Sequence, residues 1–163
     1  MEIPRRYAQI RQLLPDEVTF GVGGICFYPL DGIPAMQVGY AFTPDGQSLV
    51  SNQPGDWQPT WLVIGHDLGL GDPIFLDAAS PQLEVLTAMH GMGRWEALPA
   101  AASLDALIQC VNEFARVAVS RRDPLERAAN PLNDAQRRAY LDRIAAANGT
   151  TTAPEFWDVL LEC

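Results

Sequence analysis

The feature that most constrains the fold is a series of short β-prone segments within residues 38–89, with no helical pattern between them. Thr43-Pro44-Asp45-Gly46 is a turn sequence between two of them and predicts a hairpin. A glycine-rich connection at residues 65–72 separates two others. Successive strands joined by short loops favour an antiparallel meander. The predicted strands are residues 38–42, 47–51, 61–64, 73–76 and 84–89.

Helical patterns flank this region. Residues 3–14 place apolar side chains on one face and predict a short first helix that ends at Pro15. Residues 20–28 are β-prone, but glycines interrupt them, so we expect a broken strand there. Ser103 is the expected N-cap of a longer helix. The apolar residues of this longer helix recur at the helical period: Leu104, Leu107, Ile108, Val111, Phe114 and Ala118.

Helix signals also dominate the C-terminal part. Asp123-Pro124 and Thr152-Ala153-Pro154-Glu155 resemble capped helix starts, and a polar helix is expected over residues 133–148, ended by Gly149. The sequence therefore predicts an α+β fold. It would consist of an antiparallel or mixed sheet with flanking helices in residues 1–119 and a C-terminal helical extension, residues 120–163, packed on the same core.

The charge balance is acidic. The chain of 163 residues has 20 acidic residues against 11 basic ones, all arginine, for a net charge of −9. Such a charge repels nucleic acid and anionic membranes and favours a basic protein partner such as a nuclease domain, although acidity also serves solubility alone. Without an apolar segment of membrane-spanning length or a signal-peptide pattern, the expected location is the cytoplasm.

The three cysteines, Cys26, Cys110 and Cys163, are far apart in the sequence. Cys110 falls on the apolar side of the predicted helix and is expected in the core. The spacing indicates neither a disulfide framework nor a zinc site, which fits a reducing compartment.

Five polar residues could supply an acid/base or metal site: His66, Asp67, Asp72, Asp77 and His90. A tight connection between two strands would bring the first three close together. No sequence pattern supplies a nucleophile with an oriented base, or a further metal ligand at a defined spacing. Aspartates at strand ends usually bind local backbone amides. We therefore expect no catalytic residue, metal or cofactor, and keep as an alternative an enzyme that uses His66, Asp72 and His90.

The glycines at residues 65–72 do not predict a phosphate loop, because that loop needs a lysine before a helix, and here a strand follows. Three of the four tryptophans, Trp57, Trp61 and Trp95, lie close together in the sequence. Tryptophan is common both in cores and at interfaces. We expect mainly core positions, with Trp57, in a loop rich in Pro, Gly and Asp, the most exposed.

Four sequence motifs follow one another along the chain. They are Trp57-Gln58-Pro59-Thr60-Trp61-Leu62-Val63-Ile64-Gly65, Gly71-Asp72-Pro73-Ile74-Phe75-Leu76-Asp77, Ala88-Met89-His90-Gly91-Met92-Gly93-Arg94-Trp95 and the helix start Ala102-Ser103-Leu104. Their order resembles that of the SUKH superfamily, which includes Smi/Knr-type cell-wall regulators of yeast and many bacterial proteins. The similarity covers residues 38–118, about half of the chain. Leu14-Pro15 also matches a family element, whereas Val22-Gly23-Gly24 stands where Asn-Gly is expected.

The resemblance implies an α+β fold and, in bacteria, an immunity protein that neutralises a cognate toxin by occluding its active site. A regulatory or scaffold protein of the same fold is the alternative, since fold does not fix function. The residues expected to contact a partner are Trp57, His66, Asp67, Leu68 and Leu70. Those expected to hold the scaffold are Trp61, Gly71, Asp72, Pro73, Phe75, Asp77, His90, Gly91, Gly93 and Trp95.

Overall fold

A computed structural model describes residues 2–162 of the chain, so Met1 and Cys163 lie outside the described residues. Within this range one sheet contains six strands in sequence order, and every neighbouring pair is antiparallel. The predicted α+β fold with an antiparallel meander is therefore confirmed. The strands are β1 (Glu17–Phe20), β2 (Gly23–Phe27), β3 (Trp61–Asp67), β4 (Pro73–Asp77), β5 (Val85–Thr87) and β6 (Leu98–Ala101).

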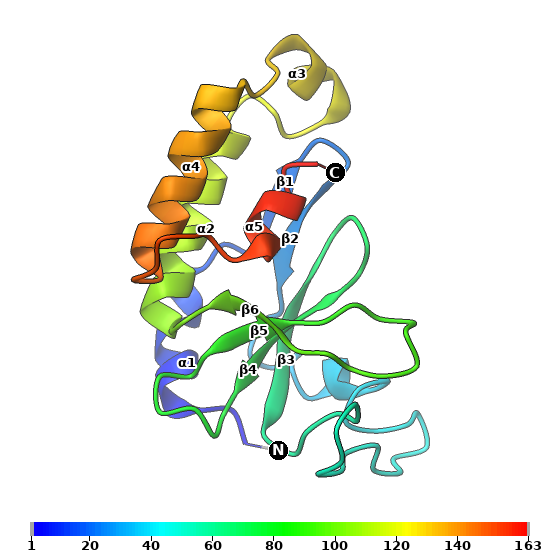
Figure 1. The fold of residues 1–163 in the computed structure, drawn as a ribbon. Helices are drawn as coiled ribbons and strands as arrows, with labels where there is room; N and C mark the ends of the chain where they lie inside the picture. Colours follow the sequence, from blue (N-terminus) through cyan, green and yellow to red (C-terminus); the bar gives the residue numbers. More distant parts are fainter. Residues whose placement is uncertain (1, 163) are drawn as a thin grey trace.

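Helices cover one face of this sheet, with α2 and α4 side by side (Figure 1). Ser103 caps α2 as predicted, because its side-chain oxygen accepts a hydrogen bond from the Ala106 N–H at 3.1 Å. The apolar stripe of α2 packs on the sheet, and Cys110 is fully buried there, as expected. Within residues 2–162 no helix is long and apolar enough to cross a membrane. The helices are α1 (Arg5–Ile10), η1 (Arg11–Leu13), η2 (Ala35–Gln37), α2 (Leu104–Ala118), α3 (Pro124–Ala129), α4 (Asp134–Ala147) and α5 (Glu155–Val159).

The long segment between β2 and β3, residues 28–60, supplies side chains to a second, smaller core that includes Trp57, Val63 and Phe75. The side chain of Gln37 ties this segment to the sheet. Its amide nitrogen donates to the Val63 carbonyl at 2.9 Å, and its amide oxygen accepts from the Val63 N–H at 3.0 Å. Pairing of β2 with β3 stops at Gly65. Gln37 therefore stands in for a neighbouring strand at Val63.

The C-terminal residues belong to the main core, in which Tyr140, Ile144 and Trp157 are all fully buried. The indole N–H of Trp157 donates to the Ala100 carbonyl at 2.7 Å and so fixes α5 against β6. The predicted helix over residues 133–148 is confirmed as α4. Its capping box consists of the reciprocal bonds between Asn133 and Gln136.

Four details of the prediction were wrong. Residues 38–42 and 47–51 form only isolated bridges, because this segment folds into the second core; the turn at Thr43–Gly46 between them is confirmed. Residues 20–28 are not one broken strand. They contain the end of β1 and all of β2, with a reversal at Gly21, whose φ is +62°. β6 was not predicted, and α5 starts at Glu155 without a side-chain cap from Thr152.

Candidate partner-binding groove

The loop between β3 and β4 is organised around Asp67, the last residue of β3. The Asp67 carboxylate accepts hydrogen bonds from the N–H groups of Gly69 at 2.9 Å, Leu70 at 2.6 Å and Asp72 at 2.8 Å. Such a cluster of backbone donors fixes a tight turn. As a result Asp67 is buried, and the Leu70 side chain is held outward with 59% of its surface exposed.

A second loop, which follows β5, is fastened to the first one by Asp72. One carboxylate oxygen of Asp72 accepts from the His90 N–H at 2.9 Å and lies 2.7 Å from the His90 imidazole Nδ1. The Asp72 side chain is nearly buried, whereas about half of the His90 side chain is exposed. This link positions Met89, which is 54% exposed, so that it lines the same hollow as Leu70.

Between these two loops and α5 lies a hollow of about 200 Å³, which we call the apolar groove. Leu70 and Met89 come from the loops, Leu98 from β6, and Phe156 and Val159 from α5. Four of these five side chains are counted among the large exposed apolar side chains of the described residues, and Phe156 is half-buried. Exposed apolar residues that gather around one hollow mark an interaction site more often than scattered ones do.

Among residues 2–162, the charged residues that line the apolar groove are all acidic: Asp67, Asp72 and Glu155. This local bias belongs to a wider one. Between residues 12 and 115 the sequence has twelve acidic residues and a single basic one, Arg94. The other ten arginines lie in α1 and η1 or at the C-terminal end of α2 and beyond. The sheet and its loops (residues 14–103) therefore carry the net negative charge of the molecule, because elsewhere the acidic residues and the arginines are equal in number.

Two residues expected to contact a partner are buried instead. Trp57 is only 1% exposed, because residues 28–60 fold onto the sheet and place its ring 4.8 Å from that of Phe75 and 5.2 Å from those of Trp61 and Trp95. The prediction that Trp57 is the exposed tryptophan was wrong. Asp67 lines the groove but is only 5% exposed, since its carboxylate serves the loop backbone.

The remaining expected contact residues divide between two places. Leu70 lines the apolar groove, whereas His66 and Leu68 are not among its lining residues. The His66 ring stacks on Tyr28, and its Nδ1 lies 2.8 Å from the Tyr28 hydroxyl. The N–H of Leu68 donates to the Gly24 carbonyl at 2.8 Å, and its side chain is half-buried.

The expected scaffold residues lie along β3, β4 and the loop after β5. Phe75 is fully buried in the second core, Trp61 and Trp95 pack against that core, and the Asp77 carboxylate accepts from the Ala79 N–H at 2.9 Å. Pro73 is buried at the start of β4. Gly71, Gly91 and Gly93 all have positive φ values of 72–79°, which favour glycine, in the two loops joined by Asp72 and His90.

For an enzyme that uses His66, Asp72 and His90, only the last two are brought together. Within residues 2–162 no group of three His, Cys, Asp or Glu side chains could hold a metal ion. Burial raises the pKa of the Cys26 thiol, and the Glu17 charge raises it further, while burial raises the pKa of Tyr28 to about 12. Neither group is activated as a nucleophile.

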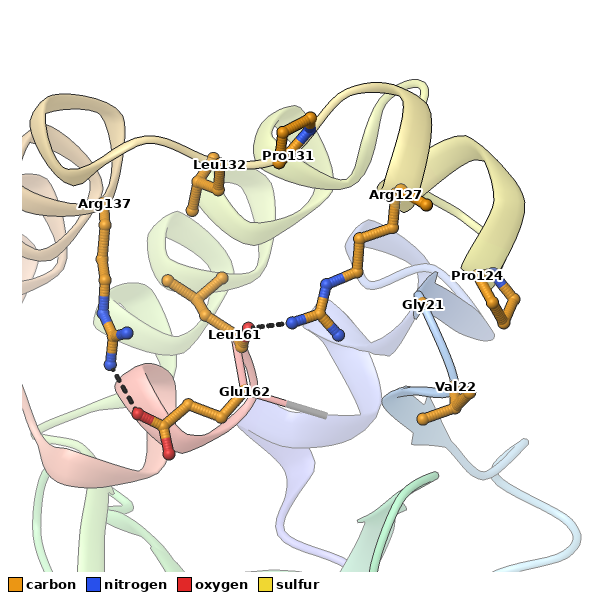
Figure 2. A pocket seen from close by; sticks show the side chains of 10 residues that line it. Gly21, Val22, Pro124, Arg127, Pro131, Leu132, Arg137, Leu161 and Glu162 are labelled. Atoms are coloured by element: carbon orange, nitrogen blue, oxygen red, sulfur yellow. Dashed lines mark hydrogen bonds and ion pairs between the residues drawn. The ribbon is translucent and has the colours of Figure 1, made fainter.

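A larger hollow lies between the β1–β2 turn, α3 and the residues Leu161 and Glu162 that follow α5 (Figure 2). Its two arginines are already engaged. Arg127 donates to the Leu161 carbonyl at 2.8 Å, and Arg137 forms an ion pair with Glu162 at 2.8 Å. We therefore place the candidate site at the apolar groove, where exposed apolar side chains gather and, among residues 2–162, the charged lining residues are acidic.

Sequence reasoning missed most of the groove: Met89, Leu98, Phe156 and Val159. The two methionines that flank His90 and Gly91, Met89 and Met92, were a usable signal, because large apolar residues in a glycine-rich loop are often exposed. Comparisons of the chain with protein-family models, with curated proteins and with solved structures find no match.

Proposed function

We propose that this chain is a non-catalytic protein-binding module, an immunity protein that neutralises a basic toxin domain by covering its active site. The observation that carries the proposal is the apolar groove with only carboxylates among its charged lining residues, on the acidic part of the molecule. The resemblance of residues 38–118 to the SUKH superfamily supports the same function. Its place of action would be the cytoplasm.

Two physical effects favour binding of such a partner. Opposite charges raise the rate at which two proteins meet in the right orientation and disfavour wrong partners. A few buried apolar anchors at the centre of the interface then supply most of the binding energy. A nuclease-like toxin with a basic, phosphate-binding surface is complementary to both features.

The test is co-expression with the products of the genes adjacent to the one that encodes this chain. We expect one product to arrest the growth of a bacterial host, the chain to restore growth, and the two proteins to purify as a stable complex that weakens at high salt. A stable partner that never arrests growth would support the regulatory or scaffold alternative and overturn toxin neutralisation. Restored growth without complex formation would overturn the occlusion mechanism.

A further inference from the structure

We infer that the apolar groove receives one large apolar side chain of the partner, flanked in that partner by lysine or arginine. This inference rests on the proposed function in one respect, that the ligand is a protein. It adds the chemistry of the partner segment that the groove recognises.

The size of the groove points to a side chain rather than to a free small molecule. Pockets for small molecules and cofactors usually have volumes of about 300–1,000 Å³. The apolar groove holds about 200 Å³, which suits one aromatic or long aliphatic side chain. A single anchor that fills a desolvated pocket is the common form of an interface hot spot.

The walls of the groove are adaptable on one side and fixed on the other. Met89 belongs to a loop, and its unbranched thioether side chain can adjust to the shape of an anchor. The opposite wall comes from α5, where Phe156 packs on the fully buried Trp157 with ring centroids 5.1 Å apart. An anchor would therefore enter between a flexible side chain and a rigid helix.

The edge of the sheet beside the groove argues against recognition by strand addition. Strand addition needs free N–H and C=O groups along an edge strand. In the edge strand β6, Pro99 has no N–H group, and the Ala100 carbonyl already accepts a hydrogen bond from the Trp157 indole. Side-chain insertion into the groove remains as the mode of contact.

The charge of the groove indicates which residues flank the apolar side chain in the partner. Glu155 is the exposed acidic residue in the groove lining. Asp67 and Asp72 also line the groove, with their carboxylates bound to N–H groups of the two loops, and no arginine of residues 2–162 lines it. An apolar segment with acidic flanks would be repelled, and one with lysine or arginine flanks would be attracted.

The experiment uses the full chain labelled with ¹³C at the methionine methyl groups and three end-blocked probe peptides. The peptides are Lys-Lys-Trp-Lys-Lys, the same peptide with Ala in place of Trp, and Glu-Glu-Trp-Glu-Glu. We expect the Met89 methyl resonance to shift in a saturable way only with the first peptide. Met36, on η2 and outside the groove lining, should not respond. A Met89 methyl that does not shift with the first peptide at millimolar concentration, or that shifts equally with the Ala peptide, would overturn the inference.

Two matched variants check that the response comes from the groove. Leu70→Ala removes most of an exposed apolar lining side chain without changing the charge of the groove, and it should weaken binding of the Trp peptide at least tenfold. Leu125→Ala makes the same change at an exposed position of α3, outside the groove, and should leave binding unchanged. Equal effects of the two variants would contradict the groove as the site.

The outcomes for the two proposals are separable. The chain could restore growth against a toxin while the Met89 methyl resonance shifts with none of the three peptides. That result would overturn the inference about the apolar side chain and leave the proposed function intact. A chain that binds the Trp peptide through Leu70, but has no growth-arresting product encoded beside it, overturns the proposed function alone.

Discussion

Gln37→Ala should destabilise the protein by about 3 kcal/mol, although it removes a polar residue from a loop segment. Gln37 is 2% exposed, and its side chain binds both the N–H and the C=O of Val63 in β3. An alanine cannot reach either group. The substitution therefore leaves two backbone groups of a central strand without their protein partner.

The magnitude follows from opposing terms. Each buried backbone group that loses its partner costs about 1–3 kcal/mol, and loss of the buried Cγ methylene of Gln37 adds about 0.8 kcal/mol. Alanine avoids the side-chain ordering cost of about 1.5–2 kcal/mol that glutamine incurs on burial. The Ile33 carbonyl, a third partner of Gln37, keeps its bond from the Met36 N–H and adds little. The central value of about 3 kcal/mol corresponds to a Tm lower by about 6–12 °C.

Urea unfolding followed by tryptophan fluorescence and by far-ultraviolet circular dichroism measures this loss. Gln12→Ala, at an exposed position of η1, is the control and should change stability by less than about 0.5 kcal/mol. A Gln37→Ala loss below about 1 kcal/mol would refute the role assigned to Gln37. Gln37→Glu gives a second check: its carboxylate would face two carbonyl groups, which raises the glutamate pKa in the folded state. The folded state then binds the proton more tightly than the unfolded state, so the stability of this variant should increase as the pH falls.

Three further predictions concern the main core. Trp157→Phe should lower the free energy of unfolding, measured in urea, by about 2–4 kcal/mol, because it removes the hydrogen-bond donor to the Ala100 carbonyl and leaves a cavity. A second, separate unfolding transition would show instead that α5 unfolds independently. Tyr7→Phe should be neutral or slightly stabilising by the same assay, because the buried Tyr7 hydroxyl has no hydrogen-bond partner among residues 2–162. A loss of stability above about 1 kcal/mol would contradict this. Burial raises the pKa of Cys110 to about 12, so a thiol reagent at pH 8 should modify Cys110 only after the protein unfolds. Rapid labelling of Cys110 in the native protein would contradict its burial in the core.

The parts of the fold that could be predicted from the sequence are those in which local pattern and tertiary packing agree. The stripe of α2 and its cap at Ser103 are set by helical periodicity and by one hydroxyl group. The apolar runs of β3 and β4 sit at the centre of the sheet, where both faces are buried. In these segments the local sequence pattern favours the same secondary structure that the packing of the core requires.

Residues 28–60 could not be predicted in the same way, because their buried side chains follow no period. Gln37 and Trp57 are buried by contacts with β3 and β4, which are distant in the sequence. β6 was not predicted because proline, here Pro99, is unfavourable within most strands, although an edge strand tolerates it.

The candidate site also combines features set by the local sequence with features set by contacts between distant segments. The turn built on Asp67 and the outward position of Leu70 depend on neighbouring residues, so the sequence indicated them. The far wall, with Phe156 and Val159, depends on the docking of α5 beside β6. That contact joins segments more than fifty residues apart, and no local pattern encodes it.

The sequential order of the six strands has a consequence for the order in which they form. Only residues 68–72 separate β3 from β4, whereas residues 28–60 separate β2 from β3. Loop-closure entropy makes the longer connection more costly by about 1.6 kcal/mol. We therefore expect the β3–β4–β5 hairpins and the β1–β2 hairpin to form early as two separate units that pair with each other late. Until then the backbone N–H and C=O of Val63 would lack their hydrogen bonds to Gln37. Pulsed hydrogen exchange during refolding would show this as late protection of the Val63 amide, after the amides between β3 and β4.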